Sequence, residues 1–452
     1  MRKVSVETIT NGRLVYNMIR MQYRLFLGVL FVAILLGIIL YARGYRINIG
    51  QNELTSNGLV AVTSSPKSAK IFINNELRGV TDTTVYLHPG TYTFTIVKEG
   101  YFPWFKTVTI KGEVVYSVDA TLYPINSSLS PLTNIGVSRA IRFGVAEQKA
   151  LIFSKRSDPM TTITPLLEPT NSQTRKDGLF VFDPNNRAAS FFSSLSSIAE
   201  YAILPPTLEP DNIRVIFSPN YDQVLLFMIP ADSVAQESQP ELATQLEVPE
   251  SYEAAYLLSL NEYNNTPLDV TASAATLVEA WSAKKALNLQ AILSGYKKPL
   301  ATFLKENTEI LDITQDKNRI MYTATSSATL NPVLTSPLIG TNQTPEKRSV
   351  EPQNIYVYDV KEDKNYLLFS SSSESPLVAN SLFFHPNAKN IIYAQNDFIT
   401  LADFDGINPQ KLYSGPFNNQ FLAIANDGRL IVLTNLNPAQ NSTGDLYAVG
   451  IR

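Results

Sequence analysis

The sequence contains no cysteine and only two histidines, His88 and His385. Without cysteine the chain forms no disulfide and offers no thiolate to a metal ion. A catalytic triad would have to use one of the two histidines, yet each precedes a proline in a turn-like stretch, LHPG or FHPN. We therefore expect both histidines to be turn residues. Charged residues are also scarce, at 17% of the 452 residues.

Familiar catalytic motifs are missing as well. The sequence has no P-loop, no G-x-G-x-x-G, no H-E-x-x-H and no G-x-S-x-G. Aspartates do recur where predicted strands end, at Asp183, Asp359, Asp403 and Asp405. Aspartate in such places usually caps a turn, and DFDG at 403–406 is only a partial match to a calcium loop. We predict no enzymatic activity, no cofactor and no metal site.

The charges are unevenly distributed along the chain. Residues 1–46 hold one acid, Glu7, and seven basic residues, which are Arg2, Lys3, Arg13, Arg20, Arg24, Arg43 and Arg46. The remaining chain carries 30 basic and 39 acidic residues and has no basic face. Binding to nucleic acid is therefore a poor expectation.

One long apolar run, LFLGVLFVAILLGIILYA, occupies residues 25–42. Eighteen uncharged residues are enough to cross about 30 Å of hydrocarbon, so the run predicts a transmembrane helix. A cleaved signal peptide is the main alternative, but the following RGYRINIG lacks a small-x-small cleavage site. Positive charge is in excess before the run, which places residues 1–24 in the cytoplasm as a short tail. A linker at 43–57 would then lead to a chain that lies outside the cytoplasm.

Residues 58–124 have the pattern of a small all-β domain. Apolar and polar residues alternate in TYTFTIV, which is typical of a strand with one buried and one wet face. Turn signals such as HPG and KEGYFP separate the predicted strands. The strands are expected at 59–64, 69–74, 91–98, 104–110 and 114–122. We expect a small antiparallel β-sandwich.

This stretch resembles the PEGA domain. The tetrapeptide that names the family aligns with Pro66-Lys67-Ser68-Ala69, where the first and last residues match. IFINNELRGVTDT is similar to the family's strand, Asn-containing turn and Gly-x-Thr step, and LHPGTYTFTIVKEGY to its Pro-Gly turn, strand and Gly-Tyr corner. The resemblance implies a small extracytoplasmic β-sandwich of bacterial and archaeal surface proteins. It carries over no catalytic residue.

An aromatic cluster follows that corner, formed by Tyr101, Phe102, Trp104 and Phe105. Packing at the edge of the sandwich is the simplest interpretation. The alternative is a contact surface for a glycan or for the next domain. These four residues are our candidate contact surface.

Residues 125–452 repeat a pattern of strand, variable loop and second strand. The pairs of runs begin with ALIFSK and GLFVFDPNN and recur to RLIVLTN and DLYAVGI at the end of the chain. Units of this kind predict a β-propeller, and the FSPN, FHPN and NDGR turns resemble the TolB-type repeat. We count five blades, with six or seven as the alternative. The last copy ends at its third strand, so a segment near 120–135 is expected to supply the missing outer strand.

Two kinds of insertion interrupt the predicted propeller. Residues 271–311 have helix-favouring composition, with Pro299 suited to a first turn. Packing across a blade or the ring mouth is the main expectation for this helical insert, and a partner groove is the alternative. Three long loops, 156–177, 231–250 and 326–353, are either disordered or binding loops.

The sequence as a whole predicts a mainly β, single-pass protein of the cell membrane. The propeller would recognise an envelope protein or a cell-wall glycan, and the sandwich would act as a spacer or adhesion unit. One alternative is a propeller-based hydrolase or lyase of the envelope. Another is an accessory subunit of a membrane complex. The lipid bilayer is the one partner that the apolar run itself implies.

Overall fold

The computed structural model describes most of the chain. The described residues are 21–39, 45–48, 53–144, 148–154, 177–186, 195–205, 210–230, 246–336, 338–371, 381–395, 397–439 and 442–451. They form two compact units. Unit 1 comprises Met1–Lys98, Pro103–Leu122 and Leu338–Gln343, and unit 2 comprises Glu99–Phe102, Tyr123–Pro337 and Thr344–Arg452.

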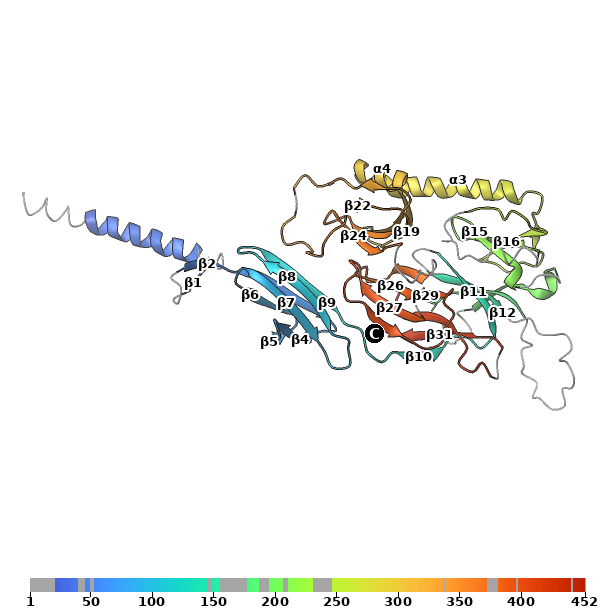
Figure 1. Cartoon of the computed structure of the whole chain (residues 1–452), viewed down its shortest axis with the longest axis horizontal. Coiled ribbons are helices and arrows are strands. Elements are labelled where there is room, and N and C mark those ends of the chain that lie inside the picture. Colours follow the sequence, from blue (N-terminus) through green and yellow to red (C-terminus); the bar gives the residue numbers. More distant parts are fainter. Residues whose placement is uncertain are drawn as a thin grey trace, which may run out of the picture. The chain divides into compact units, whose positions relative to one another are not determined.

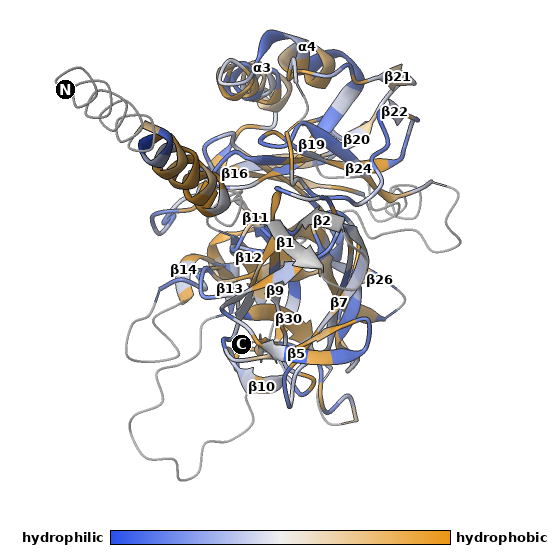
Figure 2. Cartoon of the chain, turned by 90° about the vertical axis from the view of Figure 1, so that its left-hand side faces the viewer, coloured by the Kyte–Doolittle hydropathy of each residue, from blue (hydrophilic) through white to orange (hydrophobic). Residues whose placement is uncertain are grey.

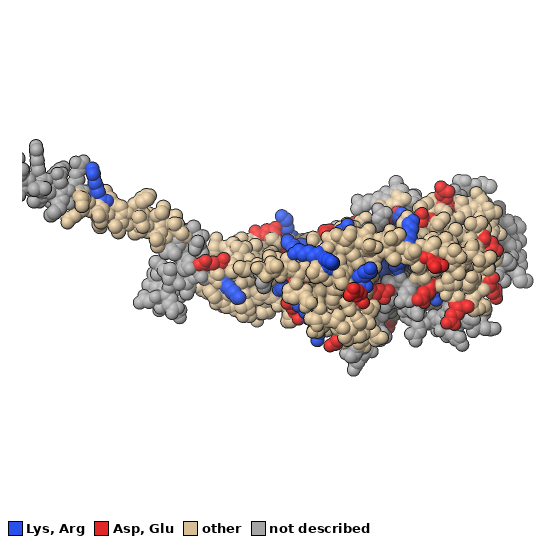
Figure 3. Space-filling model, turned by 90° about the horizontal axis from the view of Figure 1, so that it is seen from above, with Lys and Arg blue, Asp and Glu red and all other residues tan. Residues whose placement is uncertain are grey.

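A single apolar helix, Met21–Ile39, precedes the β domains. Its mean hydropathy is 2.1, and no part of it is buried against the rest of the protein. It is orange along most of its length in Figure 2, and Figure 3 shows charged side chains only toward one end. By length and composition it is the one described helix able to cross a membrane, and a signal sequence would meet the same test. It starts four residues before the predicted span, and residues 40–42 lie outside the described part.

The predicted linker at 43–57 contains a short β-hairpin. Strand β1 (Tyr45–Asn48) pairs antiparallel with β2 (Glu53–Ser56), and Tyr45 lies opposite Ser56. The hairpin shortens the path of the chain between the apolar helix and the first β domain.

Unit 1 contains a seven-stranded β domain made of two sheets (Figure 1). The strands are β3 (Gly58–Ser65), β4 (Lys70–Ile73), β5 (Glu76–Val80), β6 (Thr83–Leu87), β7 (Gly90–Val97), β8 (Trp104–Ile110) and β9 (Val115–Thr121). One sheet has the order β6-β3-β9 and the other β5-β4-β7-β8. The alternating side chains that point inward, among them Val62, Ile71 and Phe94, are fully buried and form the core.

Two expectations for this domain were wrong. Strands β5 and β6 were missed because ELRGV and TTVYL are short and mostly exposed, so no apolar alternation marks them. The unit is also not purely antiparallel, because β3 pairs with β9 in parallel. The chain crosses to the other sheet and returns between these two strands, a connection that no local pattern reveals.

Unit 2 contains five four-stranded antiparallel sheets among its described residues. Blade 1 is β11 (Val137–Phe143), β12 (Lys149–Ser154), β13 (Gly178–Phe182) and β14 (Leu195–Glu200). Blade 2 is β15 (Ile213–Phe217), β16 (Gln223–Met228), β17 (Ala254–Ser259) and β18 (Leu268–Asp269). Blade 3 is β19 (Thr308–Ile313), β20 (Arg319–Ala324), β23 (Ile355–Asp359) and β24 (Lys364–Phe369). Blade 4 is β25 (Leu382–Phe384), β26 (Asn390–Gln395), β27 (Phe398–Asp403) and β28 (Gln410–Tyr413).

Blade 5 is built from both ends of the unit, as Figure 1 shows for β10 and β31. It consists of β29 (Leu422–Ile424), β30 (Leu430–Thr434), β31 (Asp445–Gly450) and β10 (Ser128–Pro131). Strand β10 pairs antiparallel with β31 as the outer strand. The predicted closure of the ring by a segment near 120–135 is therefore confirmed, and the described residues form a five-bladed β-propeller.

Hydrophobic clusters join most neighbouring blades. Separate clusters link blades 1 and 2, blades 3 and 4, blades 4 and 5, and blades 5 and 1. Between blades 2 and 3 the corresponding clusters instead include the helical insert. Helix α3 (Ala274–Leu293) packs Val278 and Trp281 on blade 2, and Leu293 joins α4 (Lys298–Asn307) on blade 3. The insert is thus a strut between two blades.

The helical insert predicted at 271–311 extends too far at its C-terminal end, because the last helix ends at Asn307. Residues 308–311 are not helical, because Thr308 begins β19, the first strand of blade 3. Strand β19 is only half-buried and pairs with β20, so tertiary pairing overrides its local helix propensity. Pro299 does lie in the first turn of α4, as predicted.

Candidate functional site

A polar cluster lies where four blades converge. Arg142 extends from β11 of blade 1, and its guanidinium lies 4.7 Å from the ring centroid of Phe383 in blade 4. Arg142 also interacts electrostatically with Asp312 in blade 3 and with Tyr221 in the β15–β16 turn of blade 2. Residues from first strands of different blades can meet in this way only at the centre of the ring.

Asp312 is the acidic member of this ring-centre cluster. One carboxylate oxygen accepts a hydrogen bond from the backbone N–H of Phe384 at 2.8 Å, and the other from the N–H of Ile313 at 2.8 Å. Both hydrogen bonds come from the backbone, so the carboxylate is held in one orientation. The first bond crosses from blade 3 to blade 4 and makes Asp312 part of the ring's internal structure.

The surroundings shift the acid–base behaviour of the cluster. Burial raises the pKa of Asp312 to about 6, although the Phe384 N–H and the charge of Arg142 oppose the shift. Burial also lowers the pKa of Arg142 and raises that of Tyr221. Arg142 and Asp312 are only partly exposed. Each is the charge of opposite sign that acts on the other.

The groups at the ring centre are charged and form hydrogen bonds. A guanidinium over an aromatic ring, close to a carboxylate, brings charges of both signs together. The cluster was missed by sequence reasoning because Arg142 and Asp312 are 170 positions apart. Within the described residues, no group of three or more His, Cys, Asp or Glu side chains is placed to hold a metal ion.

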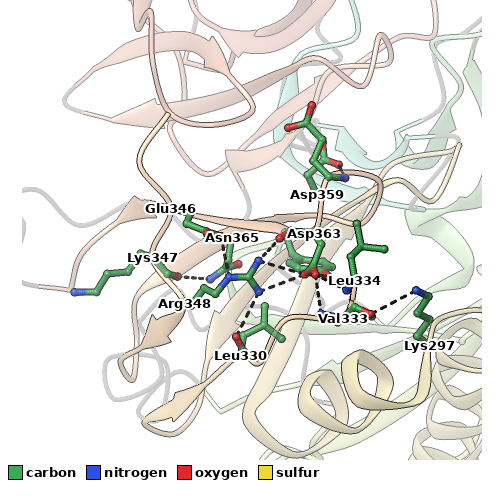
Figure 4. A network of polar contacts seen from close by, with 12 residues as sticks. Lys297, Leu330, Val333, Leu334, Glu346, Lys347, Arg348, Asp359, Asp363 and Asn365 are labelled. Atoms are coloured by element: carbon green, nitrogen blue, oxygen red, sulfur yellow. Dashed lines mark hydrogen bonds and ion pairs between the residues drawn. The ribbon is translucent and has the colours of Figure 1, made fainter. Parts of the chain in front are cut away.

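A second polar network supports the long loop 326–353 at its base (Figure 4). Asp363 accepts hydrogen bonds from the backbone N–H groups of Val333 and Leu334, at 2.6 and 2.7 Å, and from the hydroxyl of Tyr358 at 2.8 Å. Arg348, on the returning arm of the loop, forms an ion pair with Asp363 at 3.3 Å. The loop therefore has both arms attached to one buried carboxylate of blade 3.

Further contacts fix the returning arm. Asn365 is completely buried; its side chain donates to the carbonyl of Lys347 at 2.7 Å, and it accepts from Tyr322 at 2.9 Å. The two arms also pair as strands β21 (Ala328–Thr329) and β22 (Ser349–Val350). The described residues of this loop, 326–336 and 338–353, are held in place by these contacts. A binding role for the loop stays a prediction. Most of loop 156–177 and most of loop 231–250 lie outside the described part.

The pKa of Asp363 reflects its hydrogen bonds. Burial raises the pKa, but the hydrogen bonds from Leu334, Tyr358 and Val333 and the charge of Arg348 outweigh it and leave the pKa below its usual value. The carboxylate is therefore ionised at neutral pH and suited to hold the loop.

The four aromatic residues of the predicted contact site lie in different surroundings and do not form one surface. Trp104 is 2% exposed in the core of unit 1, so its inclusion in a contact surface was wrong. Phe102 packs against the cluster shared by blades 4 and 5, and Tyr101 bridges to Pro124. Phe105 is 47% exposed, and a contact role for it stays a prediction. Alternation along β8 sends Trp104 inward and Phe105 outward.

The histidines and aspartates singled out in the sequence lie at the ends of strands or within two residues of them. His88 is exposed, and His385 is buried and accepts a hydrogen bond on Nδ1 from the N–H of Asn387 at 3.1 Å. Asp183 and Asp359 accept from N–H groups two and three residues further on. Asp403 accepts from the amide groups of Asn390 and Asn408, and Asp405 from Thr344. Local turn contacts are thus confirmed for His385, Asp183, Asp359 and Asp403. Asp405 instead accepts from a residue 61 positions away, and for His88 a turn role stays a prediction.

Comparison with known families identifies the first β domain. Residues 57–126 match the family model described as the PEGA domain. This range encloses β3 to β9 and agrees with the resemblance drawn from the turn and strand pattern. Among curated proteins, none matches the chain.

Solved structures similar to this chain are β-propellers. A TolB structure from Agrobacterium tumefaciens is 11% identical, with a TM-score of 0.19, and the match covers 57% of this chain and 62% of that one. The propeller domain of the Trilobed protease from Pyrococcus furiosus is 9% identical, with a TM-score of 0.20 and coverage of 90% and 88%. The Dos1 propeller is 10% identical, with a TM-score of 0.19 and coverage of 90% and 82%. With scores this low, the assignment rests on the blade order and the closure by β10.

Proposed function

We propose that this chain is a membrane-anchored binding protein of the cell envelope, with its propeller as the recognition module and its PEGA domain as a spacer or adhesion unit. The order of parts supports this most directly: an apolar helix, then a PEGA domain, then a closed ring of blades. Both β domains would lie outside the cytoplasm, and the partner would be an envelope protein or a cell-wall glycan.

The hydrogen bonds of the two principal acids agree with a binding role better than with a catalytic one. Asp312 is occupied by backbone N–H groups, and Asp363 by the loop that it holds. A general acid or base needs a free position that faces a substrate atom. The supported loop 326–353, by contrast, is an ordered surface element of a kind that recognition modules use.

The topology can be tested with single cysteines, since the chain has none of its own. Thr83→Cys is exposed in unit 1 and should react with a membrane-impermeant maleimide in intact cells. Ser5→Cys should react only after the cells are permeabilised. Protection of Thr83→Cys in intact cells, with labelling after permeabilisation, would contradict the proposed orientation.

The recognition role can be tested by photo-crosslinking in living cells. A photoreactive residue would replace Leu268 or Leu436, which are 59% and 49% exposed in the propeller, or Leu30 in the apolar helix. We expect a discrete adduct from a propeller position. Adducts from Leu30 alone would favour an accessory subunit of a membrane complex. Turnover of envelope glycans or peptides by the purified chain would favour the hydrolase or lyase alternative.

A further inference from the structure

Unit 1 exposes a small aliphatic patch made of Val115, Leu338 and Ile339. These side chains are 62%, 49% and 79% exposed. Val115 begins β9, whereas Leu338 and Ile339 come from the tip of loop 326–353 and belong to the same compact unit. We call these three residues the apolar tip. Leaving three neighbouring aliphatic side chains in water is unfavourable.

The loop segment is seated against the ends of β8 and β9. The Gln343 side-chain amide accepts a hydrogen bond from the N–H of Thr109 at 2.7 Å and donates one to its carbonyl at 2.9 Å. Gly340 has a φ of +77°, and a Cβ there would lie 2.5 Å from the carbonyl oxygen of Val115. These contacts hold the segment in a defined position in unit 1, so the apolar tip is part of the folded structure.

The apolar tip lies at the end of the PEGA domain where the chain enters it. Strand β9 runs parallel to β3 with Val115 opposite Leu59. The N–H of Leu59 donates to the carbonyl of Val114 at 3.0 Å, and that of Glu113 donates to the carbonyl of Asn57 at 3.2 Å. Asn57 is the last residue before β3, so the tip is adjacent to the linker that leads from the apolar helix.

The linker limits how far this end can lie from the helix. Ile39 and Gly58 are separated by 18 residues, but the hairpin pairs Tyr45 with Ser56. Paired residues are about 5 Å apart. The extended path from Ile39 through the paired residues to Gly58 is then at most about 35 Å. The apolar tip belongs to the part of the domain that the chain keeps near the end of the helix.

We propose that the apolar tip inserts into the interface of the lipid bilayer on the side where the apolar helix emerges. The inference rests on the proposed function, because it needs that helix to span the membrane. A bilayer suits the patch better than a protein groove, since the patch is purely aliphatic and lacks the aromatic and arginine anchors of protein interfaces. The nearby charges, Lys111 and Glu113, are of opposite sign and favour neither anionic nor zwitterionic lipid.

The test is a depth measurement on the full chain in zwitterionic lipid nanodiscs. Single cysteines at Ile339, Val80 and Leu30 would each carry a nitroxide, and accessibility to oxygen and to a polar nickel chelate would be measured. Val80 is the matched control, an aliphatic residue that is 53% exposed at the opposite end of the same domain. Leu30 reports whether the apolar helix is in the bilayer.

We expect the label at 339 to favour oxygen over the nickel chelate by at least threefold relative to the label at 80, at both 0.1 M and 1 M salt. Gln343→Ala should abolish the difference, because it releases the segment from Thr109. If the label at 30 is in hydrocarbon while the label at 339 has the same accessibility as the label at 80, the inference fails. The proposed membrane anchor would still hold in that case. If the label at 30 is in water, the proposed anchor fails first. A label at 339 shielded from both reagents would indicate a protein partner and overturn the inference.

Discussion

The carboxylate of Asp312 in β19 and the backbone N–H of Phe384 in β25 form a hydrogen bond of 2.8 Å that joins blade 3 to blade 4. The bond lies beside Arg142 of blade 1, whose charge acts on the same carboxylate. This acid thus connects three blades, and its ionisation is coupled to the integrity of the ring.

The first prediction concerns the pH dependence of stability. Because the folded state raises the pKa of Asp312 to about 6, the stabilising contribution of its protonated form is complete below about pH 4. That contribution is lost as the pH rises through 6, at a cost of at most about 3 kcal/mol. In Asp312→Asn this change should disappear, because asparagine does not titrate. Denaturant unfolding of the full chain in detergent between pH 4 and 7 measures it, and a variant with the wild-type pH profile would contradict the assignment.

The second prediction concerns the closure of the ring. The Thr133 hydroxyl donates to Asp445 at 2.8 Å and accepts from the N–H of Leu446 at 2.9 Å. Thr133→Ala leaves a buried N–H without this acceptor and should lower the free energy of unfolding by about 1–3 kcal/mol. Thr133→Ser keeps the hydroxyl and should cost less. Equal losses in the two variants would show that the methyl group, and not the hydrogen bonds, stabilises the closure.

The third prediction concerns the base of the long loop. Asp363→Ala removes the acceptor for Val333 and Leu334 and leaves Arg348 without its buried partner, which typically costs about 3–5 kcal/mol. Amide exchange should increase across 326–353 and leave blade 5 unchanged. Glu346→Gln is the control, because that acid pairs with the same arginine at a more exposed position. Faster exchange in the control of the same size would argue against a special role for Asp363.

The fourth prediction concerns the helical strut. Trp281 is 7% exposed where α3 packs on blade 2, so Trp281→Ala should destabilise unit 2 by about 3–5 kcal/mol. Leu287→Ala, on the same helix but 65% exposed, should change stability by less than about 0.5 kcal/mol. The chain has two tryptophans, so in Trp281→Ala the fluorescence of Trp104 reports on unit 1 alone. A loss that appeared in the Trp104 signal would contradict a role confined to unit 2.

The sequence by itself determined the apolar helix, the PEGA domain and the blade repeat. It did so because each has a local signature: a long uncharged run, alternation between Pro-Gly and Gly-Tyr turns, and apolar second strands buried on both faces. Outer strands such as LSSIAE and QKLY carry no such signature, and they were recognised only from their pairing.

Only the tertiary structure decided which distant residues meet. The ring brings Arg142 to Asp312, the loop 326–353 brings Gln343 to Thr109, and β3 pairs in parallel with β9. Local patterns encode which face of a strand is buried, but not which strand or loop will cover it. The ring-centre cluster and the apolar tip are both products of such long-range contacts, so they became visible only in the folded chain.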